Sequence, residues 1–249
     1  MCLDFRTTVF FLGTSSILAT TALCLAGTLP ISGSFLRIRY VLHYRATFFV
    51  AMFLYIYRIL YSLKNVNREN VQTEIVRVTN SNGFQMTMFG FMMFFLQRPM
   101  LLSLFPVTSL AFFQWVTILN RTLSSSPEKK NWFHKVGFEM LFTQMQQNMQ
   151  IVLTLVALVE ILIFPVVIAE ALSKKSFAKF FAYLFWLQRR YHSNDNTIFR
   201  IKYTVGNTGF YHAEAWRNLN AKFFSPVTRR ISVLQKLSDG ISTWFVSAR

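Results

Sequence analysis

The sequence predicts an all-α integral membrane protein with three to four transmembrane helices, followed by interfacial and amphipathic helices on the cytosolic side. The 249-residue chain is 53% hydrophobic and only 14% charged, whereas a soluble domain has about 25% charged residues. Three of its apolar runs contain 22 residues or more, enough to cross a hydrocarbon core of about 30 Å. Because 13 of the 26 Lys and Arg lie in residues 173–249, we divide the chain into a transmembrane domain, 1–172, and a basic tail, 173–249.

The first predicted span covers residues 8–29 and ends at Pro30. Its last residues, Cys24-Leu25-Ala26-Gly27, fit the small-residue cleavage site of a signal peptide. The preceding MCLDFR is not a positively charged leader, however, so we expect the segment to be retained as a membrane span.

The second segment, 35–63, has two interpretations. Its uninterrupted apolar core runs from Ala46 to Tyr57 and is bracketed by Arg45 and Arg58. A core of this length suits a re-entrant or interfacial helix, but it can also cross if the arginine side chains extend towards the two interfaces. The sequence leaves both possibilities open.

The third segment, 84–119, is too long for one straight span, since its 36 residues would extend about 54 Å as a single helix. It is interrupted at Gln97-Arg98-Pro99 and again at Pro106. Proline lacks an N–H and its ring clashes with the preceding turn. We therefore predict a break at Pro99 and further breaks at Pro106 and, in the last span, Pro165.

The clearest span is 151–172, with Glu160 close to its midpoint. A carboxylate at mid-bilayer costs a few kcal/mol or more and must face protein or water. We favour a structural ion pair with Arg98, Arg58 or a backbone donor over an ion or proton site, because one acid without companions makes a poor relay. Arg98 is likewise expected to stabilise the break rather than to bind a substrate.

The tail begins with a short aromatic run, FAKFFAYLFWL, which is suited to the membrane interface. Two helices are expected after it, one in 207–224 with Trp216, Leu219 and Phe223 on one face, and one that begins at Ser225. Their apolar stripes either pack on the protein's own membrane domain or enter the cytosolic leaflet, where basic residues attract anionic lipid. The residues predicted to face lipid are Lys174, Lys175, Lys179, Trp186, Arg189, Arg190, Arg229, Arg230, Ile231, Leu234, Ile241 and Phe245.

Basic residues also indicate the topology, since they concentrate on the cytosolic side of membrane proteins. The tail is cytosolic whether or not segment 35–63 crosses. If it does not cross, residues 30–83 are also cytosolic and the N-terminus and residues 120–149 lie on the opposite side.

The motifs of common enzymes are missing from the sequence. The four histidines are scattered singly, and there is no nucleophile elbow, glycine-rich phosphate loop or pair of intramembrane carboxylates. The two cysteines cannot form a disulfide framework. We therefore expect no enzymatic activity, no cofactor and no metal, and the aromatic interleaving of the basic tail favours lipid over nucleic acid.

Three stretches resemble one known family. They are FFLQRPMLLSLFPV in the broken segment, Glu160-Ile161 followed by Pro165, and the set Tyr183, Leu187, Arg190, Tyr191, Ser193, Asn196 and Arg200. In this order they are similar to the transmembrane protein 33 family, the Krüppel-homologue-2-like membrane proteins. The resemblance implies a multi-pass protein of the endoplasmic reticulum and nuclear envelope, associated with reticulon-type proteins, tubular membrane shape and nuclear pore organisation. It implies no catalytic residues.

The sequence thus favours a non-enzymatic scaffold or membrane-shaping protein that acts through reticulon-type partners and a lipid-binding tail. The alternative is a channel or transporter, or a regulatory subunit of a channel, that uses Glu160 and Arg98. A dry and paired Glu160 favours the scaffold, whereas a water-accessible Glu160 favours transport.

Overall fold

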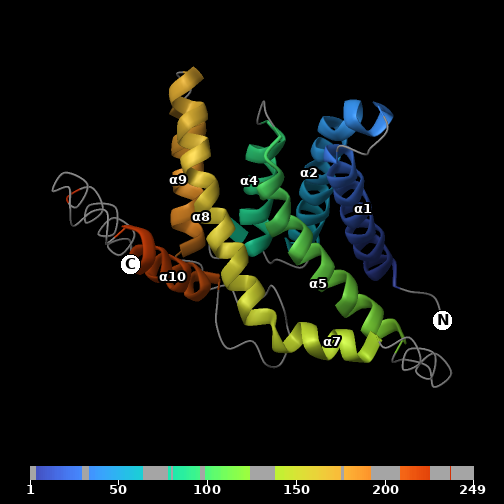
Figure 1. Cartoon of the computed structure of the whole chain (residues 1–249). Coiled ribbons are helices and arrows are strands. Elements are labelled where there is room, and N and C mark those ends of the chain that lie inside the picture. The colour runs from blue at the N-terminus through green and yellow to red at the C-terminus, as the bar shows by residue number, and fades with distance from the viewer. Residues whose placement is uncertain are drawn as a thin grey trace. The chain divides into compact units, whose positions relative to one another are not determined.

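The computed structural model describes residues 4–29, 34–63, 78–79, 81–95, 99–123, 138–174, 177–191, 208–224 and 236, and every element in these ranges is helical (Figure 1). In chain order the elements are α1 (Phe5–Thr28), α2 (Ser34–Leu63), α4 (Asn82–Phe94), the 3-10 turn η2 (Leu101–Ser103), α5 (Leu104–Leu123), α7 (Phe138–Gln147), α8 (Met149–Lys174), α9 (Phe177–Tyr191), α10 (Thr208–Leu219) and the π-helical turn η4 (Asn220–Phe224).

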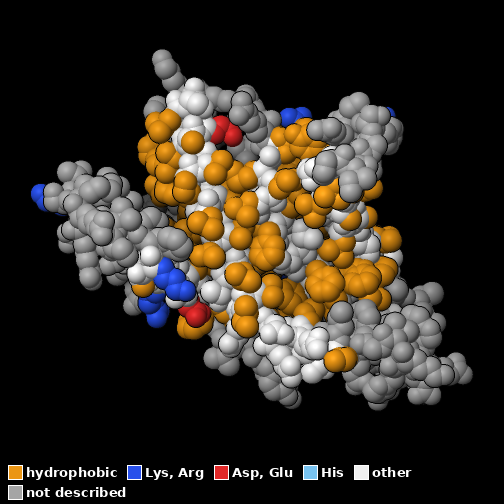
Figure 2. All heavy atoms as spheres, viewed as in Figure 1, with side chains coloured by type: hydrophobic (Ala, Val, Ile, Leu, Met, Phe, Trp, Pro, Cys, Tyr) orange, Lys and Arg blue, Asp and Glu red, His pale blue; other side chains and the backbone are white. Residues whose placement is uncertain are grey.

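Three stretches of helix are long and apolar enough to cross a membrane, namely Phe5–Thr28, Leu101–Thr122 and Met149–Ser173. On the face of the molecule shown in Figure 2, hydrophobic side chains cover much of the surface of the described helices. Such a surface is unfavourable in water but suits hydrocarbon. The predicted all-α membrane fold is therefore confirmed.

The chain divides into two compact units. The N-terminal unit contains Met1–Val71 and Met86–Val152, and the C-terminal unit contains Gln72–Gln85 and Leu153–Arg249. Most of α8 thus belongs to the same unit as the tail helices α9 and α10.

The N-terminal unit is built on an antiparallel pair of helices, α1 and α2. Their contacts extend along nearly the whole of α1, in constant register from Arg6 to Thr20 and shifted by about three residues at Cys24. From one end to the other the paired residues are Arg6–Tyr61, Phe10–Tyr57, Gly13–Leu54, Thr20–Thr47 and Cys24–Tyr40.

Gly13 permits the close approach of these two helices. A Cβ at this position would lie 2.8 Å from a δ-methyl carbon of Leu54. We expect Gly13→Leu to lower the free energy of unfolding by about 1–3 kcal/mol, the usual range for overpacking. Gly13→Ala should cost less, because the end of the Leu54 side chain can rotate away. Thermal unfolding in detergent measures both, and equal stability of Gly13→Leu and wild type would contradict this packing.

The third predicted segment is interrupted where the sequence places the break. Helix α4 ends at Phe94, Pro99 lies in non-helical backbone, and helical structure resumes at Leu101. The structure differs from prediction at the other two prolines. Pro106 lies in the first turn of α5, where its missing N–H removes no helical hydrogen bond, and α8 continues through Pro165.

The tail helices agree with the predicted segments only in part. The aromatic run forms α9, and the helix expected in 207–224 is present as α10 followed by η4. The helix expected from Ser225 onward lies outside the described residues, apart from Lys236.

Candidate functional site

A buried ionic cluster is centred on Glu160, near the middle of α8. This side chain is fully buried, so its charge has lost the stabilisation that water provides and requires a partner. Arg190, near the end of α9, supplies it. Its Nη2 lies 3.0 Å from Oε1 of Glu160 and its Nε lies 3.2 Å from Oε2. This is the two-pronged geometry in which a guanidinium binds a carboxylate most strongly.

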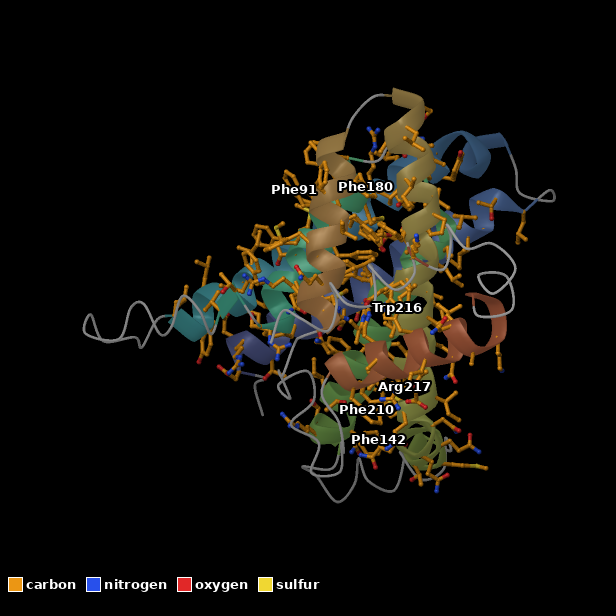
Figure 3. All side chains as sticks on the ribbon, turned by 90° about the vertical axis from the view of Figure 1, so that its left-hand side faces the viewer. Phe91, Phe142, Phe180, Phe210, Trp216 and Arg217 are labelled. Atoms are coloured by element: carbon orange, nitrogen blue, oxygen red, sulfur yellow. The ribbon has the colours of Figure 1, made fainter. Side chains whose placement is uncertain are left out.

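The imidazole of His212, on α10, contacts the same carboxylate. Its Nε2 lies 2.7 Å from Oε2 of Glu160, and its side chain is buried. Three successive described helices, α8, α9 and α10, thus meet at one acidic side chain. Figure 3 shows this region, with Phe180 marking α9 and Phe210 and Trp216 marking α10.

Gln85, in the first part of α4, belongs to the same unit and extends the cluster. Its side-chain oxygen accepts from Arg190 Nη1 at 3.4 Å, and its backbone carbonyl accepts from Trp186 Nε1 at 2.6 Å. The Tyr183 hydroxyl donates to the backbone carbonyl of Glu160 at 2.6 Å. Arg190 and the polar edges of two large aromatic rings therefore all have defined acceptors, as burial requires.

Aromatic packing surrounds the polar groups. Phe164, one turn beyond Glu160 on α8, stacks on Phe180 and Tyr183 of α9, with ring centroids 5.7 and 6.4 Å apart. The Arg190 guanidinium lies 5.8 Å from the centre of the Trp186 ring. This apolar shell keeps water from the ion pair and strengthens its electrostatic attraction.

The contacts of His212 indicate a neutral ring that donates from Nε2. Its Nδ1 is buried and has no hydrogen-bond partner among the described residues, which costs less for an acceptor nitrogen than for a charged N–H donor. Arg190 already balances the charge of Glu160. Burial lowers the pKa of His212 and the Arg190 charge acts in the same direction, although the neighbouring carboxylate opposes them.

This arrangement predicts a loss of stability in mild acid. Below the ordinary histidine pKa of about 6.5, the unfolded chain binds a proton at His212 that the folded protein disfavours, so acid favours unfolding. We expect the midpoint of thermal unfolding in detergent to fall between about pH 7.5 and about pH 5.5. His212→Gln keeps an N–H donor without the titration and should reduce that decrease. An equal decrease in both proteins would contradict a neutral His212.

The cluster is suited to holding helices together rather than to chemistry. Both oxygens of Glu160 are occupied by donors from the chain itself. Among the described residues no group of three or more His, Cys, Asp or Glu could hold a metal ion. The buried guanidinium of Arg190 compensates the charge of the Glu160 carboxylate, so this charge does not require contact with water.

Several sequence predictions change at this point. Glu160 is paired as expected, but with Arg190 and His212 in place of Arg98 or Arg58. Arg98 lies outside the described residues, and Arg58 belongs to α2 in the N-terminal unit. Trp186 and Arg190 were predicted to face lipid and are each only 2% exposed, because they form the face of α9 that packs on α8 and Gln85.

The rest of the predicted lipid-facing set is mostly undescribed. Arg189 is exposed and lies over the ring of Phe185. The other members lie outside the described residues or have side chains that the structure does not describe, namely Lys174, Lys175, Lys179, Arg229, Arg230, Ile231, Leu234, Ile241 and Phe245.

The sequence of α9 contains a pattern that could have identified Arg190 as the partner of a buried acid. Tyr183, Trp186, Leu187 and Arg190 recur at spacings of three and four and form one helical face. An arginine within an apolar face requires a buried acid, just as a mid-span glutamate requires a cation. His212 and Gln85 have no comparable signal, because each is a single polar residue in a mixed stretch.

Comparison with protein families gives one match. The family model described as transmembrane protein 33/nucleoporin POM33 matches residues 42–212, which is more than half of the chain and includes Glu160, Arg190 and His212. Comparisons with curated proteins and with solved structures gave no match. The matched family consists of membrane proteins of the endoplasmic reticulum and nuclear pore and is not known as an enzyme family. The chain therefore belongs to the transmembrane protein 33/nucleoporin POM33 family.

Proposed function

We propose that this protein is a non-enzymatic scaffold of the endoplasmic reticulum and nuclear envelope that helps to shape tubular membrane. In this proposal it acts together with reticulon-type membrane proteins, while its basic cytosolic tail binds anionic lipid. The observation that carries the proposal is the dry, fully paired Glu160, whose two oxygens contact Arg190 and His212.

The ion pair supports a scaffold more than a transporter. Transport sites need an acid that can lose its partner to a passing ion or proton. Here a two-pronged arginine, an imidazole and an aromatic shell hold the carboxylate. Releasing it would leave buried charges unpaired, at a cost of several kcal/mol. The same contacts fix α9 and α10 to α8, which provides a rigid support for the rest of the tail.

The lipid-binding part of the proposal rests on the charge of the tail. Residues 173–249 contain 13 Lys and Arg against three acidic residues. Each basic residue near an anionic leaflet contributes about 1 kcal/mol. On α9 the face turned away from α8 carries Phe181, Phe185 and Arg189, which are exposed, and this combination suits an interface.

Reconstitution of the full chain tests the membrane activity. We expect the protein to convert vesicles that contain phosphatidylserine into tubules, and to do so much less in vesicles of phosphatidylcholine alone. Arg229→Gln/Arg230→Gln should weaken the response to anionic lipid, and Lys129→Gln/Lys130→Gln, which also removes two adjacent positive charges, serves as a charge-matched control outside the tail. Vesicles that stay spherical with both lipid compositions would contradict membrane shaping by this protein alone.

The partner is tested separately by adding a purified reticulon-type protein to the same vesicles. We expect the two proteins to co-purify after solubilisation in mild detergent and to form tubules at lower protein concentration together than apart. Ion flux through vesicles that contain the wild-type chain would favour the transport alternative, particularly if Glu160→Gln, shown to be folded, altered it.

A further inference from the structure

The further inference concerns helix α2, which lies beside α1 along nearly the whole length of that candidate membrane span. The contacts between α1 and α2 begin at Arg6–Tyr61 and end at Cys24–Tyr40. Helix α1 is long and apolar enough to cross a bilayer. The stretch of α2 from Tyr40 to Tyr61 extends about 32 Å and so matches both α1 and a hydrocarbon core of about 30 Å.

The face of α2 turned away from α1 is apolar over nearly the same distance, with exposed Arg45 as its one charged member between Leu42 and Phe49. Its exposed apolar residues are separated by steps of seven, four, three and four, so they form one stripe along the helix. The stripe extends about 27 Å, again close to the hydrocarbon thickness. Its members, with their exposed fractions, are Leu42 (60%), Phe49 (57%), Phe53 (67%), Ile56 (39%) and Leu60 (61%).

The charges of α2 are compatible with crossing. Its apolar core is bracketed by Arg45 and Arg58, whose Cα atoms are about 20 Å apart along a helix. Extended arginine side chains can place their charged ends several ångströms further out, at the two interfaces. These same arginines make α2 less apolar overall than the three stretches that composition identifies as spans.

A second pair of helices in the N-terminal unit, α1 and α5, is also antiparallel. Near the start of α5, Thr108 contacts Thr21 of α1, whereas further along α5 Trp115 donates to Ser15. Helix α5 therefore runs antiparallel to α1. The side-chain oxygen of Ser103, just before α5, is 2.8 Å from the Tyr44 hydroxyl of α2, so α5 begins near the N-terminal part of α2.

We propose that α2 crosses the membrane beside α1 and that its exposed stripe lies against lipid acyl chains. Because α5 runs antiparallel to α1, the chain must then return across the membrane between α2 and α5, through the region that contains α4. In this proposal the N-terminus, residues 64–77 and residues 124–137 all lie on one side of the membrane, and residues 30–33 and 96–98 lie on the other. Eight Lys and Arg flank the first side, whereas three, Arg37, Arg39 and Arg98, flank the second. By the positive-inside rule the first side is cytosolic.

In this topology α8 begins on the cytosolic side and ends on the opposite side, so the tail can be cytosolic only beyond α9. Helix α9 runs back along α8, with Phe180 stacked on Phe164 and the Tyr183 hydroxyl bonded to the carbonyl of Glu160. The C-terminal end of α9 is thus the end nearer to the start of α8. The assignment of α2 does not depend on the proposed scaffold function.

Thiol labelling of the full chain in sealed microsomes tests the topology. The native Cys2 reports on the N-terminus in a Cys24→Ser protein, and Asn67→Cys, Ser125→Cys and Ser32→Cys, each in a Cys2→Ser/Cys24→Ser protein, report on the connections. We expect an impermeant maleimide to label Cys2, Asn67→Cys and Ser125→Cys without detergent, and to label Ser32→Cys only after the membrane is permeabilised.

The competing topology gives a different pattern. If α2 lies on the surface, Asn67→Cys and Ser32→Cys are labelled together, and Cys2 and Ser125→Cys are protected; this result would overturn the proposal. Labelling of Ser32→Cys alone in sealed microsomes would overturn the cytosolic assignment.

Discussion

Arg190→Met is expected to lower the free energy of unfolding by about 3–5 kcal/mol, the cost of leaving one partner of a buried ion pair uncompensated. Methionine retains most of the length of the side chain and its contact with Trp186, so the loss reports mainly on charge. The Glu160 carboxylate would remain buried with only His212 as a donor. Thermal or denaturant unfolding of the full chain in detergent measures the change.

Two further variants separate this effect from general damage. Arg189→Met changes the neighbouring, exposed arginine and should alter stability by about 0.5 kcal/mol or less, as surface substitutions usually do. Glu160→Gln/Arg190→Met removes both charges and should recover much of the lost stability. A double variant as unstable as Arg190→Met would show that the ion pair is not the main interaction at this site.

Trp186→Ala is expected to cost about 3–5 kcal/mol, since it empties a large buried site and removes the donor to the Gln85 carbonyl. Trp186→Phe restores most of the volume and should cost clearly less. Intrinsic fluorescence and protease resistance of the full chain in detergent, followed during unfolding, measure both variants.

Phe185→Ala provides the matched control, because Phe185 is the adjacent aromatic residue and is 49% exposed. It should leave the unfolding midpoint almost unchanged and instead reduce association with anionic vesicles. Equal stability of Trp186→Ala and Phe185→Ala would contradict the burial of Trp186. Trp186 would then face lipid, as the aromatic and basic sequence around it suggests.

These variants also separate the two roles assigned to the tail. The residues Tyr183, Trp186 and Arg190 fasten α9 to α8, so they are unavailable to lipid. The proposed lipid binding, if α9 takes part in it, requires Phe181, Phe185 and Arg189 on its other face.

The central expectation about Glu160 could be derived from its position, but its partners could not. A carboxylate in the middle of an apolar span must be compensated, whatever the fold. Arg98 was a reasonable candidate because it is the charge within the neighbouring apolar segment. Arg190 is 30 residues away along the chain and His212 is 52 residues away, and no local pattern relates either of them to Glu160.

Helix α9 shows how a local pattern can mislead. Its aromatic and basic residues are typical of an interfacial helix, and periodicity identifies an apolar face without showing what covers it. The same face, Tyr183, Trp186, Leu187 and Arg190, packs on protein instead. The difference arises because the buried carboxylate of Glu160 requires a compensating cation. Arg190 supplies it, so the face of α9 that carries Arg190 packs against α8.

The amino-acid order was sufficient to establish the membrane class, the helical content, the break at Pro99 and the need for a partner at Glu160. All four depend on interactions between near neighbours or on the length of an apolar run compared with the bilayer. Only the folded chain decided which cation meets Glu160, which face of α9 is buried, and that α2 lies along nearly the whole of α1. These depend on contacts between residues far apart in sequence, whose formation is decided by the packing of whole helices.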